Sequence, residues 1–166
     1  MADRLIEALR SRKIKAVQEA IKADPKAARG ARPVVEAGRL AFRAALELLH
    51  RNDADLNAIF RGYRALHSLL QEDAHKAAGK PDAERLECLD WLLSHGADPE
   101  QLGAWPPARA IIVAAFVGEP DYVERLRKAG AKVDPFVAAA LGDRKMVEKA
   151  LRQRPGFALE RLSSTT

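Results

Sequence analysis

The sequence predicts an all-α protein of about five consecutive helix-turn-helix units with short hairpin loops. Alanine and leucine supply much of the apolar share of the composition, whereas aromatic residues amount to only 5%. That balance favours packed helices over sheets. The sequence also contains a repeat. The segment 89–99 has the pattern of a helix end, a glycine that terminates the helix and an extended turn, and the segment 123–134 has the same pattern 34 residues later. A repeat of this length indicates stacked copies of one supersecondary unit.

Composition and charge bound the class of protein. The chain has 166 residues, of which 48% are hydrophobic and 31% charged, and this is enough for one domain with a continuous core. Its longest apolar run, 111–117, is far shorter than the ~20 residues that cross a bilayer. The start of the chain has no apolar stretch of a secretory signal, and Cys88 is the only cysteine, which fits a reducing compartment. We therefore expect a soluble, cytoplasmic protein without membrane contact.

The two clearest units, 54–99 and 100–134, resemble the ankyrin repeat. Leu66 and His67 match the end of the family's Thr-Pro-Leu-His opening of an inner helix, while Arg64 and Ala65 stand in place of Thr-Pro. Arg64 has no short oxygen with which to cap a helix, so this cap should be weaker than the usual one. The resemblance implies an ankyrin-like solenoid, in which His67 is a structural residue bonded to backbone of a hairpin.

The helix ending of the second of these units also matches the family. Its sequence is VAAFVG, at 113–118. Small Ala114 and Ala115 would let the paired helices approach closely, and Gly118 can take the left-handed conformation that ends a helix.

Three further units follow by alignment, at 4–25, 32–53 and 135–157. In the first of them, Arg12 replaces the turn glycine. In the second, we expect an inner helix at 33–38 and an outer helix at 40–50 that ends near Asn52 and Asp53. The terminal units are atypical and more polar, as a solenoid requires of repeats that have one face without a neighbour.

One insertion interrupts the repeat. The equivalent outer-helix positions Ala45 and Leu89 lie 44 residues apart, compared with about 33 in the family. The surplus falls in the polar segment 71–84, which contains Gly79 and Pro81 and is therefore predicted to be a loop between the two helices of the third unit. Such insertions often carry a specific function, but loops also drift neutrally, and both interpretations stay open.

Motifs that carry chemistry are weak in this sequence. The strongest metal-ligand candidates are Glu72, Asp73, His75, Asp82, Glu84 and Cys88. Their spacing matches no known metal-binding pattern, so we interpret the acidic residues as part of a solvated loop. Cys88 is expected on an outer helix, as a buried or half-buried thiol. The sequence also lacks a nucleophile elbow and a phosphate-binding loop. We therefore expect no catalytic residue, no cofactor and no metal, and hence a protein that is not an enzyme.

The expected function is recognition of another protein by a monomer. The ankyrin resemblance implies a concave binding surface of hairpin tips and inner helices, and aromatic and arginine side chains dominate interface energetics. Phe60 aligns with Trp105 and Arg64 with Arg109, each 45 residues apart. The candidate binding residues are therefore Phe60, Tyr63, Arg64, Trp105 and Arg109. For Phe60 and Trp105 the alternative is that they cover the core between hairpins.

Two other functions stay open. Lys and Arg outnumber Asp and Glu by 11 to 6 in residues 1–50 and by 11 to 7 in residues 101–166, whereas residues 51–100 are acidic, at 6 to 10. The basic ends could bind nucleic acid or another anionic surface, but the acidic middle makes nucleic acid the weaker expectation. A regulatory segment of a larger enzyme is the third possibility.

Overall fold

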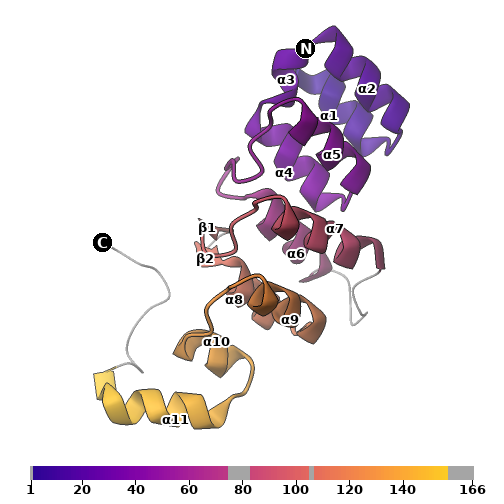
Figure 1. The fold of residues 1–166 in the computed structure, drawn as a ribbon. Coiled ribbons are helices and arrows are strands. Elements are labelled where there is room, and N and C mark those ends of the chain that lie inside the picture. The colour runs from indigo at the N-terminus through magenta and orange to yellow at the C-terminus, as the bar shows by residue number, and fades with distance from the viewer. Residues whose placement is uncertain (1, 75–82, 105–106, 157–166) are drawn as a thin grey trace.

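The computed structural model describes residues 2–74, 83–104 and 107–156. Within these ranges the protein is all-α apart from one two-stranded sheet and one isolated β-bridge, between Phe60 and Tyr63 (Figure 1). The helices are α1 (Ala2–Arg10), α2 (Ile14–Ala23), α3 (Pro25–Ala28), α4 (Ala31–Arg39), α5 (Arg43–Arg51), α6 (Ala65–Ala74), α7 (Ala83–Ser94), α8 (Ala110–Val117), α9 (Pro120–Lys128), α10 (Pro135–Ala140) and α11 (Arg144–Gln153). The strands β1 (Leu102–Gly103) and β2 (Ala108–Arg109) pair antiparallel, with Leu102 opposite Arg109.

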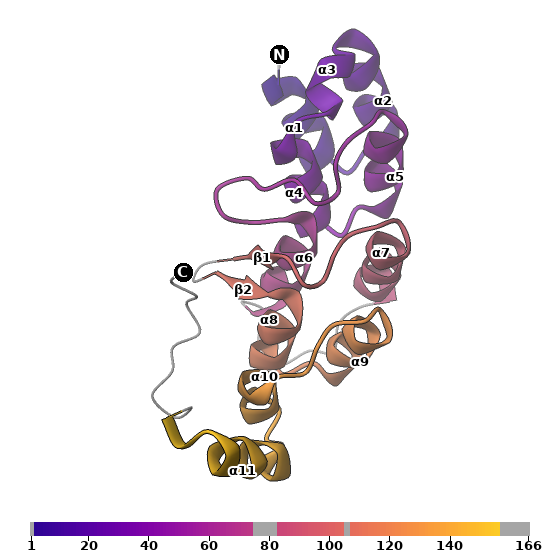
Figure 2. The ribbon, with the colours of Figure 1, turned by 60° about the vertical axis from the view of Figure 1, so that its left-hand side comes forward.

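The helices form two parallel rows. The inner row is α1, α4, α6, α8 and α10, in which each helix contacts the next, and the outer row is α2, α5, α7 and α9. Each inner helix also packs against the outer helix that follows it in the chain, and α11 packs against α10 in the same way. Figure 2 shows the resulting elongated stack, in which the loops between units project from the side of the inner row.

Apolar side chains between the two rows form one continuous core. Helix α8 lies in the middle of the stack and is apolar on every side, and all six residues from Ala110 to Ala115 are buried. Helix α11, at the end, has no buried residue. The inner helices approach closely at Gly38, where an added Cβ would lie 2.6 Å from the carbonyl oxygen of Ala65.

Left-handed residues recur at the same places in successive units. Between inner and outer helices they are Arg12, Ala41, Gly118 and Gly142, and after outer helices they are Asp53, Gly96 and Gly130. The φ of Arg12 is 53° and that of Asp53 is 63°, so Arg12 stands at a left-handed turn, where the sequence has it in place of a glycine, and Asp53 stands at the end of the outer helix. Left-handed backbone is where a helix can stop and the chain reverse.

Two predicted boundaries were wrong. The outer helix of the second unit begins at Arg43 instead of Leu40, because Ala41 is left-handed, with a φ of 49°, and breaks the helix. The predicted loop 71–84 is shorter than expected, since α6 continues to Ala74 and α7 begins at Ala83. The rest of that segment, 75–82, lies outside the described residues. No helix in the described part of the chain has the length and apolarity to span a membrane.

Candidate functional site

A tight hairpin before α6 forms one wall of the candidate site. Phe60 and Tyr63 exchange two backbone hydrogen bonds, of 2.8 and 3.0 Å. Between them Arg61 and Gly62 have φ angles of 51° and 85°, the pair of positive values that a two-residue hairpin turn requires. Glycine meets this requirement without strain. Next to the bridge, the side chain of Ile59 is exposed at 51%.

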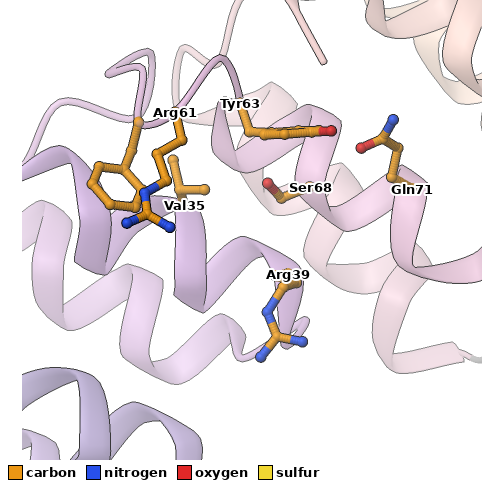
Figure 3. Close-up of a pocket in the computed structure, with 7 residues that line it drawn as sticks. Val35, Arg39, Arg61, Tyr63, Ser68 and Gln71 are labelled. Carbon is orange, nitrogen blue, oxygen red and sulfur yellow. The ribbon is translucent and has the colours of Figure 1, made fainter. Parts of the chain in front are cut away.

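An apolar cavity of about 280 Å³ lies between this hairpin and two inner helices. The lining residues come from α4, from the hairpin and from α6: Val35, Arg39, Phe60, Arg61, Tyr63, Ser68 and Gln71. Figure 3 shows that Tyr63 extends past Ser68 towards Gln71, whereas Arg39 lies on the opposite side, on α4. The cavity therefore has an apolar floor with polar groups at its edges.

A second, more polar cavity of about 240 Å³ adjoins the first. The two cavities share Val35, Phe60 and Arg61 in their walls, and together we call them the groove. The polar half is completed by Arg10, Arg32 and Glu36. Helices α1, α4 and α6 and the hairpin thus all contribute to one continuous surface.

Arginines and one glutamate set the electrostatics of the groove. The guanidinium carbons of Arg61 and Arg32 lie 5.4 and 6.0 Å from the ring centroid of Phe60, within the range of cation–π attraction. Arg10 Nε donates to Glu36 Oε1 at 2.7 Å, and Arg39 Nη2 donates to the same oxygen at 3.0 Å. Burial alone would raise the pKa of Glu36, but the hydrogen bonds from Arg39 and Arg10 outweigh it and lower that pKa. Glu36 is therefore ionised at neutral pH and fixes two guanidinium groups.

Arg64 and Arg109, two of the predicted binding residues, tie neighbouring loops together. Arg64 donates to the carbonyl oxygens of Asn57, in its own hairpin, and Leu102, in the next one. Arg109 forms ion pairs with Glu100 and Asp134, and its side chain is only 14% exposed. It also donates to a carbonyl oxygen of the following loop, at 3.0 Å. These contacts give both arginines a structural role, which the sequence-based expectation of exposed binding residues had not included.

His67 is a buried structural residue, as predicted. Its Nε2 is 2.9 Å from the carbonyl oxygen of Ala108, in the next loop. Nδ1 has no hydrogen-bond partner among the described residues, and the backbone of Gly103 packs against it so closely that a Cβ there would lie 2.6 Å away. Burial lowers the pKa of His67 to about 4, so the ring is neutral at pH 7 and its Nε2–H donates to the carbonyl.

The other predicted residues have mixed outcomes. Phe60 and Tyr63 are brought together in the groove, whereas Trp105 lies outside the described residues. Of the groove residues that sequence analysis missed, four are arginines: Arg10, Arg32, Arg39 and Arg61. A signal for two of them was present, because Arg32 and Arg39 are seven residues apart and so share one face of a helix.

The metal candidates do not form a site in the described part of the chain. Within it, no group of three or more His, Cys, Asp or Glu side chains could hold a metal ion. His75 and Asp82 lie outside the described residues, and so do the side chains of Glu72 and Asp73. Cys88 is fully buried, and burial raises the pKa of its thiol to about 12. It is therefore a protonated core residue.

An aromatic cluster lies on the outer row, away from the groove. The rings of Trp91 and His95 stack with centroids 4.3 Å apart, and His50 meets both edge-on at about 6 Å. Trp91 is half-buried and packs against the core. The cluster joins α5 to the end of α7, so it stabilises the contact between two successive units.

Comparison with known proteins adds no relative. No protein-family model matches the sequence, and a search of curated proteins finds no significant match. The groove between the hairpin and the inner helices is therefore the feature from which a function can be inferred.

Proposed function

We propose that the protein is a non-catalytic interaction module, an ankyrin-like solenoid that binds another protein on its hairpin and inner-helix surface. The ankyrin-like part is supported by the two rows of helices, by left-handed residues at equivalent turns and by the bond from His67 to the next loop. A pre-formed stack has little conformational entropy to lose when it binds. It would act as a monomer, without a metal or cofactor.

The groove is the observation that carries this proposal. Phe60 and Tyr63 supply aromatic surface, and Arg61 and Arg39 lie beside them. Aromatic and arginine side chains are the types enriched where protein interfaces have most of their binding energy. The exposed side chain of Ile59 continues this surface at the hairpin. Because the groove draws on three helices and a hairpin, its shape is fixed by the fold.

Capture from native lysate, with bound proteins identified by mass spectrometry, tests the proposed function. We expect the double variant Phe60→Ala, Tyr63→Ala to lose most of the partner captured by the unchanged chain, because truncation of an interface anchor costs ~2 kcal/mol or more. The matched control is Phe116→Ala, which truncates a phenylalanine that is 70% exposed and lines neither cavity. Equal capture by all three proteins, with unchanged circular dichroism, would contradict the proposal.

Binding of nucleic acid is the second candidate, since arginines gather in the groove. Phosphate contacts release counterions, so such binding would fall steeply as salt is raised. Repeating the capture in nuclease-treated lysate at two salt concentrations separates the two candidates.

A further inference from the structure

The groove has an apolar half and a polar half, which lie side by side and restrict the chemistry of a partner that could fill both. One half is lined by Val35, Phe60 and Tyr63 and is mainly apolar, whereas the other is mainly polar and lined by arginines. Val35, Phe60 and Arg61 belong to both halves. A ligand that fills the groove therefore has an apolar group directly beside a polar one.

The groove as a whole has a surplus of positive charge. Four arginines line the groove, namely Arg10, Arg32, Arg39 and Arg61, against a single carboxylate, that of Glu36. Glu36 is only 13% exposed and is shared by Arg10 and Arg39, whose side chains are 58% and 38% exposed. Arg61 is exposed, and among the described residues its side chain contacts the ring of Phe60 but no carboxylate. Arg61 therefore faces solvent at the rim, in a position to pair with an anion, and the exposed Arg10 adds positive charge nearby.

We infer that the groove binds a linear acidic segment of the partner protein, an inference that rests on the proposed function. An aliphatic or aromatic side chain of that segment occupies the apolar half against Phe60 and Tyr63. A neighbouring aspartate or glutamate lies in the polar half, where the planar guanidinium of Arg61 can donate two parallel hydrogen bonds to its carboxylate. Phe60 joins the halves, because its ring supports Arg61 and Arg32 while it also lines the apolar half.

A peptide fits the groove better than nucleic acid does. A phosphate backbone needs a continuous track of positive charge, but Glu36 places a carboxylate in the wall of the polar half. The apolar half has a volume of about 280 Å³ and is lined like a pocket for a side chain.

Selection of random linear peptides displayed on phage, of about twelve residues each, tests the inference on the full chain. The most enriched peptide is then synthesised with a fluorescent label, and its affinity is measured by anisotropy. We expect enriched peptides to carry Asp or Glu next to an apolar residue. Arg61→Glu should weaken binding of the labelled peptide about tenfold or more, because it reverses a charge at the rim. Arg152→Glu makes the same change in net charge on exposed α11 and should alter affinity by less than about twofold.

Several outcomes would overturn the inference. They are enrichment of neutral or basic peptides, the absence of any enrichment, equal weakening by both variants, and displacement of the peptide by mixed-sequence duplex DNA at equal concentration. If one of these occurs while lysate capture still depends on Phe60 and Tyr63, the proposed function stands, but the inference that the groove binds an acidic segment is wrong. If capture is also insensitive to Phe60 and Tyr63, both proposals fail.

Discussion

At the scale of single residues, two arginines stand directly before inner helices, where short polar side chains often cap a helix, and bond to neighbouring loops instead. Arg109 is the residue before α8, and its side chain makes no capping bond to that helix. It instead reaches Glu100 in its own loop and Asp134 in the next, and Arg64 likewise reaches Leu102 in the next loop. A long, planar donor therefore links consecutive units at two equivalent positions.

Replacement of Arg109 should destabilise the protein measurably. Arg109→Gln leaves the carboxylates of Glu100 and Asp134 without their ion pairs, and hydrogen bonds to charged groups contribute about 1.5–3 kcal/mol each where they are shielded. We expect the free energy of unfolding, measured by urea denaturation, to fall by about 2 kcal/mol. Arg144→Gln is the control, since this arginine is 89% exposed and, among the described residues, pairs with Glu148 of its own helix. Exposed pairs of this kind contribute about 0.5 kcal/mol or less. Equal losses for the two variants would argue against the inter-unit tie.

His67 should make stability depend on pH. Its pKa is lowered from 6.5 to about 4 in the folded state, chiefly by burial. As pH falls below 6.5, the unfolded chain binds a proton at this histidine, whereas the folded chain does so only near pH 4. The free energy of unfolding is therefore undiminished above pH 6.5 and falls by roughly 3 kcal/mol between pH 6.5 and 4. Between pH 7 and 5 the unfolding midpoint of His67→Gln should fall less than that of the unchanged chain. Parallel curves for His67→Gln and the unchanged chain would refute the assignment.

At the scale of elements, close approach of the inner helices depends on glycine. A Cβ at position 38 would lie 2.6–2.9 Å from backbone atoms of Ala65, which cannot move aside without displacing α6. The helix propensity of alanine exceeds that of glycine by about 1 kcal/mol, but overpacking of this kind costs ~1–3 kcal/mol.

Gly38→Ala should therefore lower the melting temperature despite its better helix propensity. A net loss of 1 kcal/mol corresponds to about 2–4 °C for a protein of this size. Gly156→Ala, where a Cβ would meet no atom within 4 Å, should leave the melting temperature unchanged. A melting temperature of Gly38→Ala at or above that of the unchanged chain would show that α4 and α6 are not packed as described.

Most elements could be predicted from the sequence because their signals are local. Periodic apolar residues and turn residues such as Gly118 mark a helix and its end within a few positions, and α8 ends there as expected. The start of α5 could not be predicted in this way, since nothing in the residue type of Ala41 favours its left-handed φ of 49°. Contacts of the surrounding units hold Ala41, which is buried, in that conformation.

The groove was harder to predict than the helices. Phe60 and Tyr63 lie close together in the sequence, so their juxtaposition followed from the predicted hairpin. Arg10 and Arg61, by contrast, are 51 residues apart and line the same cavity only because α1, α4 and the hairpin stack. A pattern within one helix carries no information about such non-local neighbours.

At the scale of the whole molecule, the stack should be least stable at its C-terminal end. Helix α11 has no buried residue, whereas α8, in the middle, has six. In a linear array each unit is stabilised only by its neighbours, so a terminal unit opens more readily. Hydrogen exchange should therefore be fastest in the amides of α11 and slowest in those of α6 and α8. Uniform protection along the chain would indicate a single cooperative core instead.

Hydrogen–deuterium exchange of the full chain with and without its captured partner tests the central proposal most directly, because it locates the binding surface without any substitution. We predict that the partner slows exchange in the hairpin around Arg61 and in α4, the elements that enclose the groove. Exchange in the outer helices α5 and α9 should change little. Protection confined to the outer row, with the hairpin and α4 unaffected, would contradict recognition through the groove.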